Sequence, residues 1–235
     1  MKLLAIDTAT EAMSVALHDA STVCAHRFEL IGRGHAERVL PLVQEVLAEQ
    51  GWALSDLTAL AVGRGPGAFT GVRIGISVAQ GLAYGLGIPV VGVSDLEAVA
   101  VGALELAAAS GIAAGAVLVA MDARMGELYA GYYRVRAGGQ LDPQFEALCR
   151  PEDLPGRIQT SGPLVLAGHG FAAYPMLRET IGGAVGCFEG ALPEARFLAR
   201  MAVAVLREGG AVPAHRLEPV YLRDDVATRS VRSPG

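Results

Sequence analysis

The opening of the chain alternates short apolar runs with brief polar connections. The runs are "KLLAID" (2–7), "MSVALHD" (13–19) and "TVCAHRFEL" (22–30). Three strands joined by such short connections predict an antiparallel meander. From 35 to 50 the apolar positions recur at helical spacing, which predicts an amphipathic helix. Pro41 lies inside this helix and is expected to kink it, or to mark the start of its regular part.

The pattern then changes to strands that alternate with helices. We expect a buried strand at 57–63, a glycine-rich helix at 70–86, a strand at 89–93 and a helix at 95–108. Ser94 and Asp95 are good capping residues for the last of these helices.

A weak internal repeat begins after Gly115. The segment 116–133 can be laid over 2–19, with Asp122 on Asp7, Ala120 on Ala5 and Gly131 on Ala16. Both copies read as a strand, an aspartate, a short polar bend and a second strand. The repeat predicts two similar lobes, each opening with an aspartate-bearing hairpin.

Duplicated lobes with this element order predict an α/β fold of the actin, hexokinase and Hsp70 type, with a degenerate nucleotide site between the lobes. We assign 1–110 to the N-terminal lobe, joined by an amphipathic helix at 194–209. The C-terminal lobe comprises 111–193 together with 216–228, and 229–235 is expected to be a loose tail.

Composition and charge narrow the functional classes. The 235 residues are 52% hydrophobic and 18% charged, which favours a folded globule, and the net charge of -5 comes without any lysine or arginine run. A chain without a basic surface is not expected to bind nucleic acid by itself. Cys24, Cys149 and Cys187 form no CxxC motif, which is typical of free thiols in the cytoplasm.

Membrane and targeting signals are not expected. Asp7 interrupts the first apolar run after four residues, unlike a signal peptide. The segment 98–121 carries Glu105 as its only charge, but Ser110 and Gly111 divide it. We interpret it as a buried helix, a turn and a strand rather than a membrane span.

The glycine-rich stretch at 63–87 could in principle hold a phosphate. However, Val72 follows Gly71 where a P-loop needs lysine, and Pro66 removes an N–H donor from the looser dinucleotide pattern at 65–71. An interior helical glycine costs about 0.8–1 kcal/mol relative to alanine, so these glycines need another reason.

Close packing supplies that reason. Gly71, Gly75, Ala79 and Ala83 fall on one stripe of the helix, and Ser77, Gly81 and Gly85 fall on another. At least one stripe is expected to pack on the chain's own sheet, and the other could receive a second chain.

Five segments carry a resemblance to a known family. They are "IDTAT" (6–10), "GHAERVLPLVQEVL" (34–47), "GRGPGAFTGVRIGISVAQGLAYGLGIPVVGVSDLEA" (63–98), "MDARMGELYAG" (121–131) and "PVYLRDDVA" (219–227). Together they resemble the TsaB family, whose members are non-catalytic relatives of the tRNA-modifying protein TsaD.

The resemblance implies a role in forming threonylcarbamoyladenosine next to the anticodon of tRNAs that read codons beginning with A. In that family TsaB supports TsaD, which transfers the threonylcarbamoyl group from its adenylate to the tRNA, and the ATPase TsaE joins them. The resemblance further implies that this chain has no catalytic residues, no metal and no cofactor of its own. It meets tRNA only indirectly, and it could bind nucleotide only in complex with its partners.

The implied contact surface is the first long helix together with the glycine helix, which pair with TsaD as a helical bundle. The same surface would form a homodimer when TsaD is absent. The expected interface residues are His35, Val39, Leu42, Val43, Val46, Thr70, Gly71, Arg73, Ile74, Gly75, Ser77, Val78 and Gly81. For His35 we favour a capping or interface role over a ligand role, and Arg73 either forms a salt bridge to the partner or is solvated.

Remnants of a nucleotide site would fall at the hairpins and a glycine turn. The candidates are Asp7, Thr8, Thr10, Asp122, Arg124, Gly168 and Gly170. For both aspartates we favour turn chemistry, in which each carboxylate accepts hydrogen bonds from its own bend. TsaD-like members bind metal through an HxxxH pair, but here Val39 stands four residues after His35.

Two alternatives stay open at this point. One is an ATPase or phosphotransferase that uses Asp7 or Asp122 with magnesium. The other is a peptidase, although no serine or cysteine has a recognisable neighbouring base.

Overall fold

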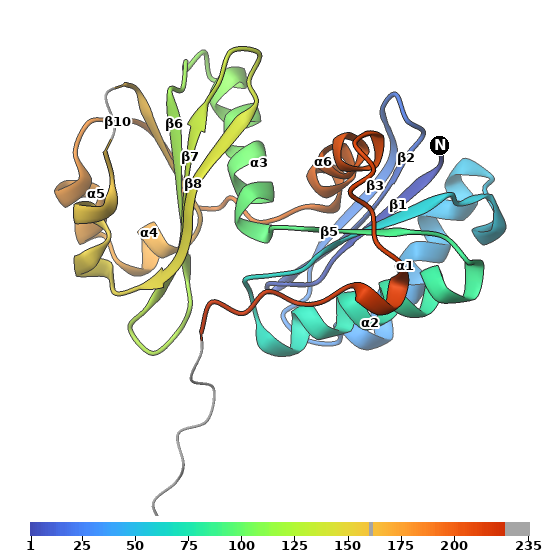
Figure 1. The fold of residues 1–235 in the computed structure, drawn as a ribbon. Helices are drawn as coiled ribbons and strands as arrows, with labels where there is room; N and C mark the ends of the chain where they lie inside the picture. The colour runs from blue at the N-terminus through green and yellow to red at the C-terminus, as the bar shows by residue number, and fades with distance from the viewer. Residues whose placement is uncertain (160–161, 224–235) are drawn as a thin grey trace, which may run out of the picture.

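The computed structural model describes residues 1–159 and 162–223, which form two lobes, each built on a five-stranded mixed sheet (Figure 1). The first sheet has the order β3-β2-β1-β4-β5. Its strands are β1 (Leu3–Asp7), β2 (Ala12–His18), β3 (Val23–Leu30), β4 (Ala59–Gly63) and β5 (Val90–Val93). β1, β2 and β3 pair antiparallel, which confirms the predicted meander, and β1, β4 and β5 pair in parallel.

The second sheet repeats this arrangement in the order β10-β9-β6-β7-β8. Its strands are β6 (Ala116–Asp122), β7 (Leu128–Val135), β8 (Leu141–Cys149), β9 (Leu164–Ala167) and β10 (Ala184–Phe188). The predicted duplication is therefore confirmed, and the actin-like α/β fold with it.

The predicted overlay of the two hairpins is wrong by one residue in its second strand. Ala5 pairs with Ala16, whereas Ala120 pairs with Ala130 and not with Gly131. The bend that follows Asp122 is one residue shorter than the bend that follows Asp7, so an ungapped overlay slips.

Helices cover the two faces of each sheet. They are α1 (His35–Gln50), α2 (Phe69–Leu86), α3 (Asp95–Ala109), α4 (Gly170–Ala173), α5 (Met176–Ile181) and α6 (Ala195–Arg207). Short 3-10 turns lie at η1 (Leu54–Asp56), η2 (Pro151–Asp153), η3 (Pro155–Arg157) and η4 (Ala214–Arg216). Helix α1 has the predicted bounds, and Pro41 lies inside it without ending it.

Alternation along the strands builds two hydrophobic layers in the first lobe. Leu4 and Ile6 of β1 face α1 and α2, whereas Leu3 and Ala5 face α6 on the other side of the sheet. Leu4 and Ile6 are fully buried. The order of these layers puts α1 and α2 side by side on one face (Figure 1).

Two segments link the lobes. Helix α3 falls in the range assigned to the first lobe; most of its buried residues share a cluster with β6 and β9 of the second sheet, and Ala98 packs in a cluster of the first sheet. The predicted capping by Ser94 is present, since its Oγ accepts a hydrogen bond from the Glu97 amide.

The closing segment contacts both lobes. Val212 pairs with Val90, the Val220 amide donates to the Arg64 carbonyl, and Arg223 reaches Glu127 in the second lobe. The expected loose tail at 229–235 lies outside the described residues.

Across the two described ranges, no helix is both long enough and apolar enough to span a bilayer. The segment 98–121 forms the rest of α3, a turn and most of β6, as predicted.

Candidate functional site

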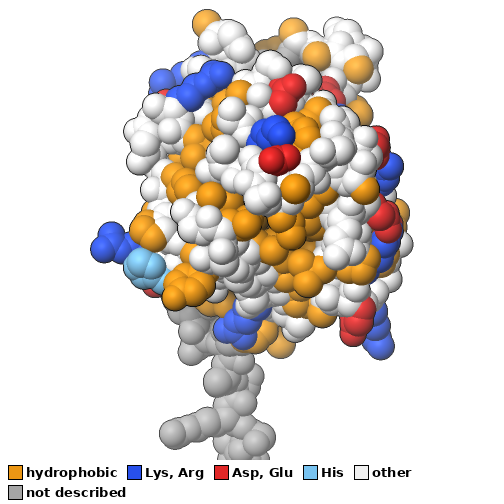
Figure 2. Space-filling model, turned by 90° about the vertical axis from the view of Figure 1, so that its right-hand side faces the viewer, with side chains coloured by type: hydrophobic (Ala, Val, Ile, Leu, Met, Phe, Trp, Pro, Cys, Tyr) orange, Lys and Arg blue, Asp and Glu red, His pale blue; other side chains and the backbone are white. Residues whose placement is uncertain are grey.

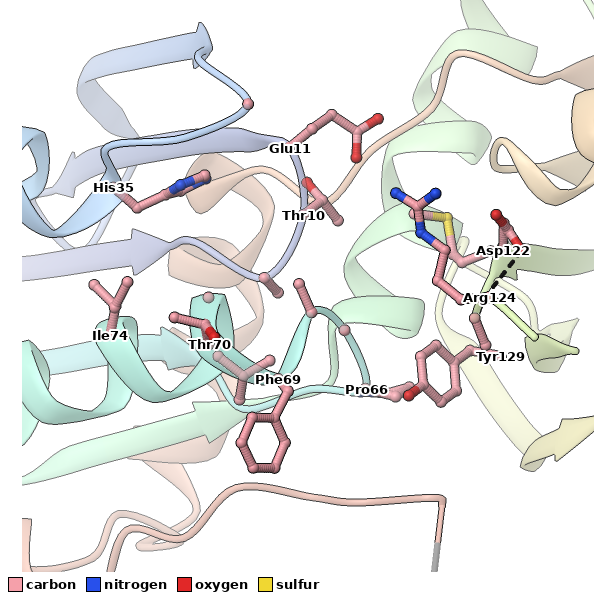
Figure 3. Close-up of a pocket in the computed structure, with 18 of the residues that line it drawn as sticks. Thr10, Glu11, His35, Pro66, Phe69, Thr70, Ile74, Asp122, Arg124 and Tyr129 are labelled. Atoms are coloured by element: carbon pink, nitrogen blue, oxygen red, sulfur yellow. Dashed lines mark hydrogen bonds between the residues drawn. The ribbon is translucent and has the colours of Figure 1, made fainter. Parts of the chain in front are cut away.

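A cleft of about 1060 Å³ opens between the lobes. The hairpin bends of both lobes, the start of α1, the glycine loop and the start of α2 line it. In Figure 3, Thr10 and Glu11 lie on the side of the first lobe, and Asp122, Arg124 and Tyr129 lie on the other side. This is the position that the duplicated fold predicts for a nucleotide.

The first hairpin does not present its aspartate to the cleft. Asp7 is fully buried, and its Oδ1 accepts a hydrogen bond from the Ala9 amide at 3.1 Å, which is the turn chemistry expected for it. Thr8 is also buried, and its hydroxyl donates to the Gly71 carbonyl at 2.7 Å. Of the three candidates in this hairpin, only Thr10 lines the cleft.

The second hairpin does reach the cleft. Asp122 and Arg124 both line it, and Asp122 Oδ1 accepts a hydrogen bond from the Arg124 amide at 3.0 Å. Arg124 and Met125, which also line the cleft, adopt positive φ angles of 65° and 56°. The Asp122 carboxylate is therefore engaged in its own bend, as expected from turn chemistry.

The glycine turn after β9 serves packing. A Cβ at Gly168 or Gly170 would lie 2.5 or 2.7 Å from the Ala120 carbonyl oxygen, so both positions need glycine to approach β6. Between them His169 lines the cleft, and its Nδ1 accepts a hydrogen bond from the Asp122 amide at 3.1 Å. Sequence reasoning did not single out His169, because no spacing rule marks a lone histidine.

The predicted interface residues divide into a buried and an exposed set. On α1, the four apolar candidates are buried in the core of their own lobe and present no surface: Val39, Leu42, Val43 and Val46. They repeat on the face of the helix that covers the sheet, and pattern alone does not say whether an apolar face meets the same chain or another. His35 is also buried, with its Nε2 3.3 Å from the Ala12 carbonyl oxygen.

Helix α2 packs closely against its own lobe along one stripe. A Cβ at Gly71 would collide with the Thr8 carbonyl oxygen, and one at Gly75 would lie 2.7 Å from the Thr8 hydroxyl. Ala79 and Ala83 are buried along the same stripe. The expected tight fit of one stripe on its own lobe is thereby confirmed.

The opposite side of α2 is open. Among the described ranges 1–159 and 162–223, a Cβ at Gly81 or at Gly85 would meet no atom outside the helix within 4 Å. Thr70 and Ser77 are exposed as well, and Ile74 and Val78 are half-buried beside them.

Arg73 is exposed, and within residues 1–159 and 162–223 it contacts two aromatic side chains and forms no salt bridge, so its predicted role toward a partner stays a prediction. Its guanidinium lies 3.4 Å from the centroid of the Phe69 ring, and its Nε donates to the Tyr221 hydroxyl at 2.8 Å. Both aromatic side chains are exposed at the mouth of the cleft. Tyr221 comes from the closing segment, so sequence spacing could not have paired it with α2.

Metal-ligand groups and reactive thiols are the features that bear on the hydrolytic alternatives. Within residues 1–159 and 162–223, no group of three His, Cys, Asp or Glu side chains is placed to hold a metal ion. The free cysteines Cys149 and Cys187 have pKa values raised by burial, which disfavours the reactive thiolate.

Two five-stranded sheets of matching order, each opening with an aspartate hairpin, define a member of the actin, hexokinase and Hsp70 fold class. The family model described as "TsaD: tRNA N6-adenosine threonylcarbamoyltransferase" matches residues 29–228.

Two named relatives identify the branch of the family more closely. An Escherichia coli (strain K12) protein named "tRNA threonylcarbamoyladenosine biosynthesis protein TsaB" is 46% identical over 98% of this chain and 98% of its own length. A Haemophilus influenzae protein of the same name is 37% identical over 98% of this chain and 97% of its own length.

A solved structure agrees with them. The Pseudomonas aeruginosa protein titled "YeaZ" superposes with a TM-score of 0.82 at 40% identity and covers 94% of this chain and 99% of its own. The chain belongs to the TsaB family, within the wider TsaD family.

Proposed function

We propose that this chain is a non-catalytic subunit that binds and supports TsaD during the formation of threonylcarbamoyladenosine in tRNA. Full-length relatives that carry this pathway in their names support the role in the modification. The partner role goes beyond those names and rests on the surface of the first lobe.

The observation that carries the proposal is the two-sided use of glycine in α2. Gly71 and Gly75 are explained by contact with Thr8 of the same lobe, whereas a Cβ built on Gly81 or Gly85 would meet no atom of the described residues outside the helix within 4 Å. Interior helical glycines cost about 0.8–1 kcal/mol each relative to alanine, so the open pair is unexplained by the chain alone. A helix from another chain packed closely on this stripe would account for both.

The surroundings of the open glycines suit such a contact. Ile74, Val78 and Leu82 are half-buried on α2, and Leu40 on α1 and Tyr84 on α2 are exposed by 45% and 81%. Figure 2 views the first lobe end-on and shows hydrophobic side chains gathered across the middle of that face, with one pair of opposite charges above them and other charged side chains toward the margins. An apolar centre with a charged rim is the composition of protein interfaces.

The geometry of the cleft favours a supporting role over the alternative of an ATPase or phosphotransferase. The Asp7 carboxylate is enclosed behind the first hairpin, and Oδ1 of Asp122 accepts one hydrogen bond from the Arg124 amide of its own bend and one from the Tyr174 hydroxyl. A phosphoryl-transfer site needs carboxylates that can reach a magnesium ion at the phosphates. The ATPase alternative would regain support if the isolated chain hydrolysed ATP and Asp122→Asn abolished the activity.

The remaining parts of the proposal follow from the same role. TsaE joins the assembled complex, tRNA is contacted through the partner, and nucleotide is bound only within the assembly. In the absence of TsaD, the open stripe of α2 pairs two copies of this chain into a homodimer. All of this takes place in the cytoplasm.

The test is a bulky substitution on the open stripe with a matched control. Gly81→Leu places a side chain where there is open space, so the isolated chain should fold, but a partner helix can no longer approach. The control is Ala204→Leu, at an exposed position of α6 on the opposite face of the first sheet.

Co-purification with TsaD from the same source and light scattering of the isolated chain give the readout. Gly81→Leu should lose both TsaD and the homodimer, while Ala204→Leu keeps both. Equal binding by the two variants would refute the proposed surface.

A further inference from the structure

Two buried carboxyl groups meet behind the inter-lobe cleft. Asp7 ends β1 and Asp95 begins α3, and the two residues are exposed by only 0% and 2%. A Cβ built on Gly63 would collide with Asp7 Oδ2 and with Asp95 Oδ1, so the two oxygens converge over the same glycine of β4. Gly63 thus leaves room for one carboxyl to contact the other.

The outer oxygen of each carboxyl already has a backbone partner. Asp7 Oδ1 accepts from the Ala9 amide at 3.1 Å, and Asp95 Oδ2 accepts from the Gly65 amide. The inner oxygens, Asp7 Oδ2 and Asp95 Oδ1, are buried and receive no donor from the described residues. Buried polar atoms are rarely left in this state, so something must lie between these two.

Two ionised carboxylates could not occupy this place without a cation. Like charges this close repel strongly, and burial adds a desolvation cost for each charge. The other ionisable groups that act on the pair are His35 of α1, which favours the charged form of Asp7, and Glu146 of β8, which disfavours that of Asp95. Glu97 of α3 and Arg64 of the glycine loop interact with each other beside Glu146.

Burial raises the pKa of Asp7, and burial together with the neighbouring Asp7 charge raises the pKa of Asp95 well above its ordinary value. In such a contact the two groups titrate as a pair, so the raised pKa belongs to both. The direction agrees with the geometry, because a hydrogen between the inner oxygens satisfies both of them.

We propose that Asp7 and Asp95 share one proton at neutral pH and that this proton locks the glycine loop to the end of β1 and the start of α3. The locked loop carries Pro66 and leads into α2. The Ala68 amide donates to the Ala9 carbonyl at 2.7 Å, which continues the connection from the first hairpin into the helix.

The lock also joins the lobes. Helix α3 packs on the second sheet, while β1, β4 and the glycine loop belong to the first lobe. Sharing a proton therefore fixes the floor of the cleft and the first turn of α2 at the same time. The proton sharing does not rest on the proposed binding of TsaD, and it can be tested on the isolated chain.

Substitution by asparagine gives a sharp test. In Asp95→Asn, the amide oxygen can accept from Gly65 while Nδ2 donates to Asp7 Oδ2. In Asp7→Asn, the oxygen can accept from Ala9 while Nδ2 donates to Asp95 Oδ1. Each single variant keeps one negative charge and one fixed donor, as in the singly protonated pair.

The double variant Asp7→Asn with Asp95→Asn differs, because two Nδ2 donors then face each other. Rotating one side-chain amide by half a turn would remove the clash between the two Nδ2 groups, but the backbone N–H of Ala9 or Gly65 would then lose its acceptor. We expect the urea midpoint of each single variant to stay within a few tenths of a molar of the wild-type value. The urea midpoint of the double variant should drop by clearly more than the two single changes added together. Additive behaviour would overturn the shared proton.

Carbon-13 NMR of the aspartate carboxyl groups measures the proton directly. Resonances that vanish in the single variants assign the pair, and at pH 7 they should show one bound proton between them. Two fully ionised carboxylates at pH 7 would overturn the proposal. So would a wild-type urea midpoint that falls on adding EDTA, since a bound cation would then occupy the place of the proton.

The pair also predicts a sign for the effect of pH. The pKa of the pair is higher in the folded state than in the unfolded state. The stability that the shared proton contributes is therefore fully present below the ordinary aspartate pKa of about 3.9 and is lost as pH rises through the raised pKa. Asp95→Asn has no proton to lose, so its stability should decline less than that of wild type above neutral pH. Equal declines in the two proteins would contradict a titrating lock.

Discussion

Alanine substitutions of two glycines in α2 separate the two roles assigned to this helix. At Gly71 a Cβ collides with the backbone carbonyl oxygen of Thr8, which cannot swing away as the end of a side chain could. Overpacking of this kind costs about 1–3 kcal/mol. At Gly81 the Cβ meets no atom within 4 Å in the part of the chain that the structure describes, and the change to alanine gains about 0.8–1 kcal/mol of helix propensity.

These values convert to melting temperatures. For a chain of this size, 1 kcal/mol shifts Tm by about 2–4 °C. Gly81→Ala should therefore raise Tm by about 2–4 °C, whereas the overpacking in Gly71→Ala should lower it by about 2–12 °C, less a smaller propensity gain in the first turn. Scanning calorimetry at low protein concentration keeps dimer formation out of the comparison.

The reasoning predicts changes in Tm of opposite sign for the two variants. A rise in Tm for both variants would mean that Thr8 and α2 are not in close contact. A fall for both would mean that the Gly81 side is covered within the isolated chain, and the reasoning about an open stripe would be refuted.

Three further predictions follow from the packing. Phe197→Ala removes the buried ring that lies against Gly102 between α6 and α3, and should cost about 3–5 kcal/mol in urea denaturation, where a loss below 1 kcal/mol would be inconsistent with the packing. Arg223→Ala removes the 2.7 Å contact with Glu127, and should speed limited proteolysis of the closing segment without changing the core; an unchanged rate would show that this contact does not hold the segment. Glu105→Gln weakens only half-exposed surface ion pairs, so its Tm should stay within about 2–4 °C of wild type, and a larger drop would contradict the low value assigned to these pairs.

Much of the fold could be predicted because local pattern determined it. The tight connections between the first three apolar runs left only a meander, and the second aspartate hairpin pointed to a duplicated lobe. The capping of α3 by Ser94 could likewise be read from the sequence. These features depend on residues that are close together along the chain.

The features that the sequence could not give depend on residues far apart in it. Val39 and Val43 were expected at an interface but lie in the core, since periodicity marks an apolar face without saying what covers it. Asp95 was predicted only as a cap, and its contact with Asp7 requires the strand order of the folded sheet. Arg73 could not be paired with Tyr221 for the same reason.

The central claim is that this chain supports a catalytic partner and does no chemistry itself. The most direct measurement reconstitutes tRNA modification from TsaD, TsaE and the threonylcarbamoyl-adenylate, with wild-type chain, Gly81→Leu, Asp122→Asn or no chain. The account predicts that modification requires the chain, is lost with Gly81→Leu and persists with Asp122→Asn. Modification that proceeds equally without the chain, or that fails with Asp122→Asn while the complex still assembles, would contradict it.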